Sequence, residues 1–311
     1  MPEKTQQDAV AWRTKADELI RQGKYDDAFK SYDESLKLDP KQYSAWNGKG
    51  IALYQQGKFE EAIKCYDEAV RLEPRYSAAW YDKGDALNRV GRFEEALRCL
   101  DEAIKLDPKF AFSWYQKGLA LLNLGKVEES TKSCDEAIKL IPNFGAAWNV
   151  KGVALFKLGN YEEAVKAFDE YLKQDKKNSA VWHNKGDALG KLRRYEEAVK
   201  YLDEAIKLNP RFAPTWFERG NALLADQKYQ VAADSFNEAL KLEPENAKAL
   251  YFKAFALHNL GKFDEAEKLY DEVLRIDPKN PRAKPMKDRA HSKLKPGEVY
   301  AHGGRKIDIT K

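Results

Sequence analysis

The residues that could take part in chemistry are few and scattered along this chain of 311 residues. Three cysteines, Cys65, Cys99 and Cys134, are widely spaced and belong to no Cys-x-x-Cys or Cys/His cluster, so we expect no metal site. They are expected to be buried thiols that pack as small hydrophobic side chains. The four histidines include no pair four residues apart, and each is expected to be a surface residue rather than a ligand or a base.

Gly-Lys dipeptides and Asp-Glu pairs also have plain structural interpretations. The dipeptides Gly57-Lys58 and Gly125-Lys126 are not followed by Ser or Thr and lack the upstream glycine of a phosphate-binding loop, so we expect them to end helices. The Asp-Glu pairs recur on one expected helix face, where water would solvate them. The sequence therefore predicts neither an enzyme nor a bound cofactor.

Composition and charge narrow the class of protein further. The net charge is +4, but residues 281–311 hold nine Lys or Arg against three Asp or Glu, so the excess positive charge lies at one end. A nucleic-acid binder is expected to carry that charge along its working surface. No apolar run approaches the roughly 20 residues that span a bilayer, and the first residues lack the apolar core of a signal peptide. We therefore expect a cytoplasmic protein.

Tryptophan recurs every 34 residues and sets the period of the whole chain. The series is Trp12, Trp46, Trp80, Trp114, Trp148, Trp182 and Trp216. Proline repeats with the same spacing, except that Lys176 stands in one expected proline position. Such a period is typical of stacked repeats. The predicted units, which we call repeats, are 9–42, 43–76, 77–110, 111–144, 145–178, 179–212, 213–246 and 247–280.

Each unit is predicted to form two helices. In the third repeat, apolar or small residues recur at helical spacing, as in Trp80, Gly84 and Leu87. Gly91 is expected to end this first helix in a left-handed cap, and the second helix should end before Pro108. The glycine within the first helix would let two helices approach closely. The tryptophan stripe is interpreted as core.

At this point the sequence resembles the tetratricopeptide repeat (TPR) family over residues 9–280. In the second repeat the family pattern is carried by Trp46, Gly50, Ala62, Tyr66, Ala69 and Pro74. Two departures are systematic, because Leu replaces a family Tyr, as at Leu53, and Lys or Arg replaces a family Leu. The resemblance implies an all-α, right-handed alpha-alpha superhelix of eight helix–turn–helix repeats plus a C-terminal capping helix. It also implies a protein-interaction scaffold whose first helices line a concave, peptide-binding groove.

The systematic Lys suggests a ladder of ion pairs. Every first helix carries Lys or Arg three residues after the tryptophan position, and every second helix carries Asp or Asn at one fixed position. The single Arg, Arg219, and the single Asn, Asn237, fall in the same unit. This coincidence favours the hypothesis of a regular Lys–Asp ladder between the two antiparallel helices of a pair. Exposed pairs of this kind contribute about 0–1 kcal/mol each.

The fifth and sixth units depart from the pattern. Tyr171 occupies a position that is otherwise small, and Lys176 replaces the proline. Gly190 introduces a glycine within a helix, and Arg193 replaces the turn glycine. Two interpretations stay open, namely compensation across one interface and a softer joint that divides the array into five plus three units.

The two ends of the array are expected to differ from its middle, because an open end would expose core. Residues 1–8 are predicted to be a flexible N-terminus. Residues 281–295 continue the register and are predicted to form a capping helix. Residues 296–311 are predicted to be a flexible basic tail, or alternatively a strand that docks in a neighbouring groove.

The groove implied by the resemblance gives a set of candidate binding residues. They are Tyr81, Asp85, Asn88, Phe112, Tyr115, Leu119, Leu122, Asn149, Phe156, Asn184 and Asp187. Apolar side chains would anchor a peptide and Asn side chains would hold its backbone. The alternative is that part of this strip is buried between neighbouring first helices.

The chemistry of the groove bears on its partner. Family members that clamp a carboxylate use a Lys one residue after the tryptophan position, and none of the eight repeats has a Lys there. Asp17, Asp85 and Asp187 would also repel a carboxylate. We therefore expect a protein or peptide partner that is neutral or basic rather than an acidic C-terminal tail, and neither a nucleic acid nor a membrane. Two alternatives remain, which are RNA binding and self-assembly through the tail at 296–311. The oligomeric state is left open.

Overall fold

The computed structural model describes residues 3–295, 298–300 and 306–308, and the side chains of residues 5–295. The described part contains seventeen helices and one short pair of strands. The helices are α1 (Glu3–Arg21), α2 (Tyr25–Leu38), α3 (Tyr43–Gln55), α4 (Phe59–Leu72), α5 (Ser77–Arg89), α6 (Phe93–Leu106), α7 (Ala111–Asn123), α8 (Val127–Leu140), α9 (Gly145–Lys157), α10 (Tyr161–Leu172), α11 (Ser179–Lys191), α12 (Tyr195–Leu208), α13 (Ala213–Ala225), α14 (Tyr229–Leu242), α15 (Ala247–Asn259), α16 (Phe263–Ile276) and α17 (Ala283–His291). The all-α class and the helix pair of each repeat are confirmed.

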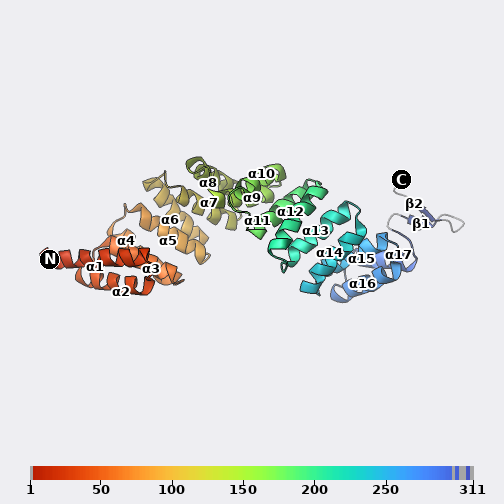
Figure 1. Ribbon diagram of the computed structural model, residues 1–311, viewed down its shortest axis with the longest axis horizontal. Coiled ribbons are helices and arrows are strands. Elements are labelled where there is room, and N and C mark those ends of the chain that lie inside the picture. The colour runs from red at the N-terminus through yellow and green to blue at the C-terminus, as the bar shows by residue number, and fades with distance from the viewer. Residues whose placement is uncertain (1–2, 296–297, 301–305, 309–311) are drawn as a thin grey trace. The chain divides into compact units, whose positions relative to one another are not determined.

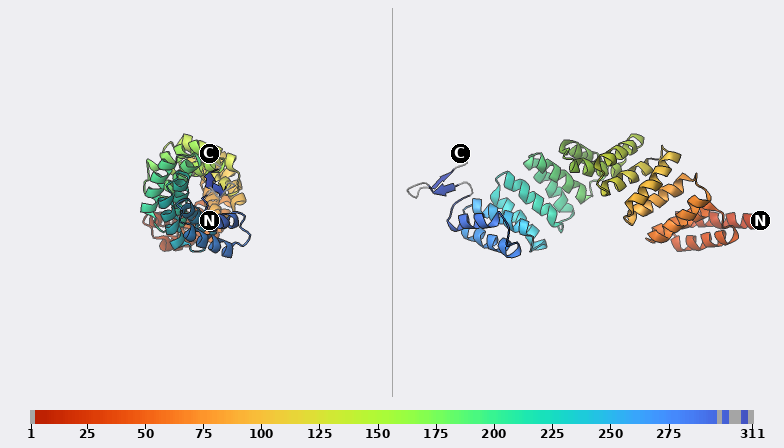
Figure 2. Two further views of the ribbon diagram at one scale, coloured as in Figure 1. Left: turned by 90° about the vertical axis from the view of Figure 1, so that its right-hand side faces the viewer. Right: turned by 180° about the vertical axis from the view of Figure 1, so that it is seen from behind.

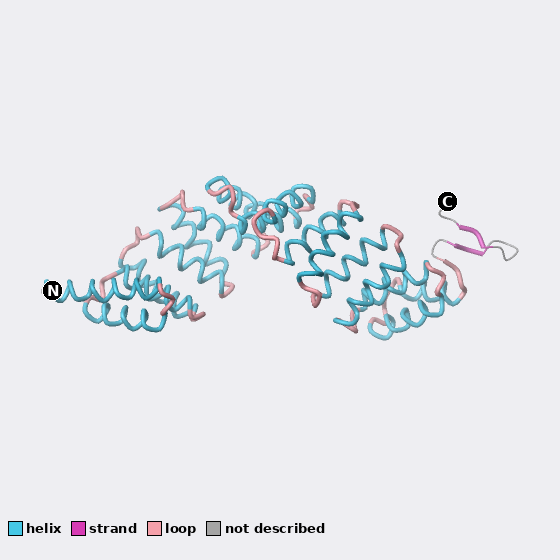
Figure 3. Tube along the Cα trace, in the orientation of Figure 1, coloured by secondary structure: helices cyan, strands magenta, loops and turns pink. Residues whose placement is uncertain are grey.

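The chain divides into two compact units, which we call the first unit (residues 1–158) and the second unit (residues 159–311). In the first unit each helix from α1 to α9 packs on the next, and consecutive first helices such as α5 and α7 also touch (Figure 1). In the second unit α10 to α17 follow the same pattern (Figure 2). Short loops join the helices within each unit (Figure 3). None of the described helices is long and apolar enough to cross a membrane.

Left-handed residues end the first helices as the sequence predicts. Gly57 has a φ of 77°, and the next residue, Lys58, donates its backbone N–H to the carbonyl of Leu53. This arrangement closes the helix and is the usual reason for a glycine after its last turn. In two repeats of the second unit, Arg193 and Gln227 adopt the same conformation without being glycine, at φ values of 62° and 60°. The turn is therefore kept even where its preferred residue is missing.

Small residues inside the first helices allow close helix packing, as expected. A Cβ atom built on Gly50 would lie 2.5 Å from the Tyr66 ring, and one built on Gly84 would lie 2.7 Å from Leu100. The three cysteines are buried in second helices, and Cys134 is fully enclosed. Burial raises the pKa of Cys134 to about 12, so this thiol stays protonated and packs as an apolar side chain.

The tryptophans lie at the edge of the core, because all seven are half-buried and Trp46 and Trp80 pack against clusters of buried residues. In six repeats from the second onwards, the indole N–H donates to a carbonyl six residues earlier, for example from Trp46 to Pro40 at 2.9 Å. Trp182 makes the same bond to Lys176 at 2.8 Å, although the proline is absent there. The tryptophans therefore fasten the turn between repeats more than they fill the interior.

The ladder of charged pairs exists, and its pairs join consecutive repeats. Lys117 lies 2.7 Å from Asp101 of the preceding repeat, and Lys83 lies 2.6 Å from Asp67 in the same way. The first helix of each repeat packs against the second helix of the repeat before it, which brings these groups together. Arg219 accordingly bonds Asp203, and Lys253 donates to Asn237. The occurrence of Arg219 and Asn237 in one repeat thus reflects no contact between them.

Helix α17 covers the end of the second unit and buries Ala283 and Ala290 against it. The expectation that every histidine is a surface residue is wrong for His258, which is fully buried. The ring Nε2 of His258 lies 2.5 Å from the carbonyl oxygen of Leu294, so it ties the segment after α17 to α15.

Two three-residue strands follow this segment, β1 (Glu298–Tyr300) and β2 (Lys306–Asp308), paired antiparallel. The remaining residues of 296–311 and residues 1–2 lie outside the described part. The flexibility of both termini and the joint between the fifth and sixth repeats stay predictions.

Candidate functional site

Five aromatic rings meet in the first unit where α7 and α9 begin. Phe110 lies 4.9 Å from Tyr81 and 5.4 Å from Phe112, and Phe144 lies 4.9 Å from Phe112 and 5.1 Å from Tyr115, all between ring centroids. These spacings are those of favourable aromatic pairs. Phe110 and Phe112 remain 37% and 41% exposed. We call this set the aromatic ladder, and it is a partly exposed apolar surface.

Local structure explains how the ladder is assembled. Phe110 and Phe144 are the last residues before α7 and α9, and each has a non-helical backbone conformation. Tyr81, Phe112 and Tyr115 lie near the starts of α5 and α7. Because consecutive first helices pack side by side, their N-terminal turns are brought to one edge of the first unit.

Asp82 and Asp85, both on α5, lie near the ladder in different surroundings. Asp85 accepts hydrogen bonds from the Tyr54 hydroxyl at 2.9 Å and from Gln116 Nε2 at 2.6 Å. Arg89 in turn donates to the Tyr54 hydroxyl. The carboxylate of Asp85 is therefore engaged within the protein and joins α3, α5 and α7.

Asp82 accepts fewer hydrogen bonds than Asp85 does. Its Oδ2 accepts one hydrogen bond, from Asn47 Nδ2 at 2.9 Å. Burial, opposed in part by that hydrogen bond and reinforced by the nearby Asp85, raises the pKa of Asp82 to about 6. No ion pair in the described part of the chain involves this carboxylate. Its charge is therefore poorly compensated.

A pocket of about 290 Å³ opens beside Asp82. Its walls come from α5, from the end of α6 and from the start of α7. They are Ser77, Ala78, Tyr81, Asp82, Ala103, Asp107, Phe110 and Ser113. We call this the Asp82 pocket, and it shares Tyr81 and Phe110 with the aromatic ladder.

The other predicted residues of the first unit are less available. Asn88 is buried, and its Nδ2 donates to the backbone carbonyl and the side-chain oxygen of Gln116, so it holds α7 against α5. Leu119 and Leu122 are half-buried on α7, and Asn149 and Phe156 are half-buried on α9. The structure therefore brings Tyr81, Phe112 and Tyr115 together and gives Asn88 a role inside the protein.

Asn184 and Asp187 belong to the second unit, on α11. Asp187 pairs with Lys191 at 3.4 Å and lines a pocket of about 200 Å³ together with Glu218 of α13. Burial, followed by the charge of Asp187, raises the pKa of Glu218. The predicted binding residues thus form separate surfaces on the two units.

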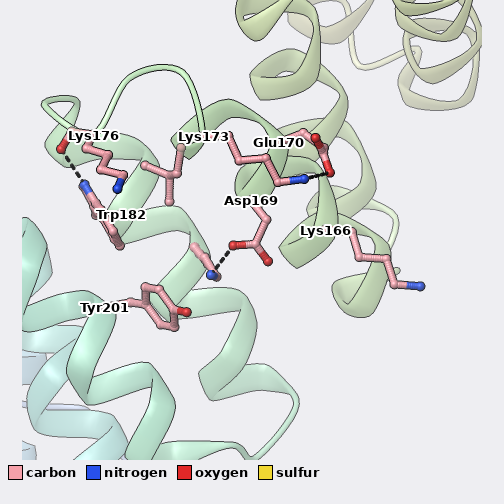
Figure 4. Close-up of a pocket in the computed structure, with 9 residues that line it drawn as sticks. Lys166, Asp169, Glu170, Lys173, Lys176, Trp182 and Tyr201 are labelled. Atoms are coloured by element: carbon pink, nitrogen blue, oxygen red, sulfur yellow. Dashed lines mark hydrogen bonds and ion pairs between the residues drawn. The ribbon is translucent and has the colours of Figure 1, made fainter. Parts of the chain in front are cut away.

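A pocket of about 600 Å³ lies over α10, α11 and α12 in the second unit. Figure 4 shows Lys176 beside Trp182, while Lys166 points away from them. Lys185, which also lines this pocket, forms an ion pair with Asp169. A pocket of about 570 Å³ lies over Trp80, Lys83 and Asp101 in the first unit. Both are built on the tryptophan and lysine that recur in the repeats, so we attribute them to repeat packing rather than to a specific site.

Sequence reasoning missed part of the ladder. Phe110 and Phe144 end their repeats, outside the first helices from which the candidates were chosen. The signal was present, since Tyr76 and Phe212 end two other repeats. Among residues 5–295, no three His, Cys, Asp or Glu side chains gather as metal ligands would.

Comparison with known proteins settles the family. The tetratricopeptide repeat profile matches six stretches, namely 13–77, 49–109, 81–143, 115–179, 183–241 and 217–281, and consecutive stretches overlap except between 179 and 183. The chain belongs to the tetratricopeptide repeat family. No curated protein matches this TPR protein.

Solved structures show the same TPR fold. The PilF protein of Pseudomonas aeruginosa is 18% identical over 68% of this chain and 97% of its own, with a TM-score of 0.61. A tetratricopeptide repeat protein from Parabacteroides merdae is 16% identical over 81% and 99%, with a TM-score of 0.57. YrrB, described as a TPR protein with an unusual peptide-binding site, is 21% identical over 59% and 95%, with a TM-score of 0.52.

Proposed function

We propose that this TPR protein is an interaction scaffold without catalytic activity, and that its first unit binds a peptide segment of a partner protein across the aromatic ladder. The observation that carries the proposal is the ladder itself, since Phe110 and Phe112 leave apolar rings exposed at one edge. Aromatic side chains of this kind are typical anchors of protein interfaces. Family membership supports a binding role in general.

The charge beside the ladder favours a neutral or basic peptide. Asp82 and Asp107 line the adjoining pocket, and none of the residues that line it is a Lys, Arg or His. An acidic peptide would meet like charge there, which costs binding energy. The same carboxylates disfavour RNA, whose phosphates account for much of its affinity for proteins.

A random peptide library displayed on phage tests the proposal on the full chain. Wild type should enrich peptides with apolar or aromatic residues, and Phe112→Ala should weaken the best synthetic peptide by about tenfold or more. Phe212→Ala is the matched control, because Phe212 has a similar exposed fraction, 43% against 41%, but lies in the second unit. The control should bind as wild type does.

Two results would overturn this function. Equal losses for Phe112→Ala and Phe212→Ala would show that the ladder is not the binding surface. Tight binding of single-stranded RNA that falls steeply with salt in a filter-binding assay would favour an RNA-binding protein instead.

A further inference from the structure

The Asp82 pocket has a chemical character that the aromatic ladder alone does not explain. Two of the residues that line it, Asp82 and Asp107, are acidic. Asp82 receives a single hydrogen bond, from the neutral amide of Asn47. A carboxylate in such surroundings is stabilised most by a cation that enters from outside.

A second polar group in the same pocket lacks a partner. Ser113 is only 1% exposed, and its hydroxyl makes no hydrogen bond to any described residue. Buried hydroxyls are almost always satisfied, because an unmade bond costs free energy. Ser113 can accept a hydrogen bond from an N–H group of a ligand in this pocket. Asp82 and Ser113 can therefore both accept hydrogen bonds from one ligand.

Neither group is required by the repeat fold. The position of Asp82 is occupied in the other repeats by Thr14, Gly48, Gln116, Val150, Asn184, Glu218 and Phe252. The position of Ser113 is alanine in five of the eight repeats. The combination is therefore particular to this pocket, unlike the pockets over the recurring tryptophan and lysine.

We propose that the Asp82 pocket receives a lysine or arginine side chain of the bound peptide. The apolar stem would lie along the rings of Tyr81 and Phe110 that line the pocket, and the cationic head would donate to Asp82 and Ser113. Aromatic faces also attract cations, which adds to the preference. This inference rests on the proposed function, because the pocket adjoins the ladder through those two rings.

A metal ion suits the pocket less well than an organic cation. Calcium takes six to eight oxygen ligands, and magnesium demands a near-ideal octahedron. The pocket supplies the carboxylates of Asp82 and Asp107 and the Ser113 hydroxyl, while its remaining walls are largely aromatic and aliphatic. Asp107 Oδ1 is already engaged by the backbone N–H of Lys109 at 3.1 Å.

The test uses the strongest synthetic peptide from the phage library and the same peptide with its basic residue replaced by norleucine. Wild type should bind the norleucine peptide about tenfold or more weakly, the scale expected for a close charge pair. Asp82→Asn should bind both peptides with nearly equal affinity. Ser113→Ala, which restores the commonest residue at that position, should also weaken the basic peptide. Glu102→Gln removes the same charge from the surface of α6 and should behave as wild type.

The outcomes separate the two proposals. Enriched peptides with aromatic anchors but no basic residue, or an equal norleucine effect in wild type and Asp82→Asn, would overturn the cation pocket and leave the scaffold function intact. An equal loss in Glu102→Gln would attribute the preference to the general field of the protein. No enrichment of any peptide would mean that the proposed function itself fails.

Discussion

Asp82→Asn should stabilise the free protein at neutral pH while weakening its binding of basic peptides. Burial is the main cause that raises the pKa of this carboxyl from 3.8 to about 6, so the folded state disfavours its charge. One pKa unit corresponds to about 1.4 kcal/mol, which places the penalty at up to about 3 kcal/mol above pH 6. Asparagine has the same shape, carries no charge and can still accept the hydrogen bond from Asn47.

The sign of the pH dependence follows from the two pKa values. Well below pH 3.8 the carboxyl is protonated in both the folded and the unfolded chain, so the substitution should change stability little. Between the unfolded and folded pKa values the unfolded chain loses its proton first, and the wild type loses stability as pH rises. The advantage of Asp82→Asn should therefore grow from pH 4 to pH 6 and then level off.

Native-state hydrogen exchange of the α5 amides, measured for both proteins at pH 4 and pH 7, reports this local stability. Exchange in Asp82→Asn should be slower than in wild type at pH 7, and the difference should be much smaller at pH 4, after correction for intrinsic rates. Destabilisation of similar size at both pH values would refute the reasoning, because it would show that the carboxylate of Asp82 has a structural role. A gain in stability with a loss of binding is typical of a functional residue.

Two further predictions concern the repeats themselves. Gly50→Ala should lower the free energy of unfolding in urea by about 1–3 kcal/mol, because the new methyl group would meet the Tyr66 ring. Gly190→Ala places its methyl group in open space and should raise that free energy by up to about 1 kcal/mol through helix propensity. Equal effects of the two substitutions would contradict the packing argument. A double-mutant cycle should show coupling of about 0–1 kcal/mol between Lys117→Met and Asp101→Asn. The same cycle with Asp135→Asn should show none, and the reverse result would restore pairing within a repeat.

The repeat and its helices could be predicted from the sequence, because these features depend on local patterns. The 34-residue spacing of tryptophan, the turn glycines such as Gly57 and the helical spacing of small residues each act over a few turns of chain. Close packing at Gly50 and burial of Cys134 followed from the same local argument. These features survive wherever the neighbouring repeats lie.

Which charged groups meet depends on how the helices stack. A first helix packs both on the second helix of its own repeat and on that of the preceding repeat, so Lys117 has an Asp on each neighbour, 16 residues before it and 18 residues after it. Packing placed Lys117 beside Asp101 rather than beside Asp135. It also enclosed His258, whose burial depends on a segment 36 residues further along the chain.

The candidate site shows the same limit at the scale of single side chains. Asp82 and Asp85 are the same residue type, on the same helix, one turn apart. Tyr54 and Gln116 reach Asp85, whereas Asn47 alone donates to Asp82. Asp85 is among the candidates chosen from the sequence, whereas the proposed cation pocket is built on Asp82. Chain position cannot reveal which carboxylate lacks partners, because those partners come from α3 and α7, which reach α5 only when the repeats stack.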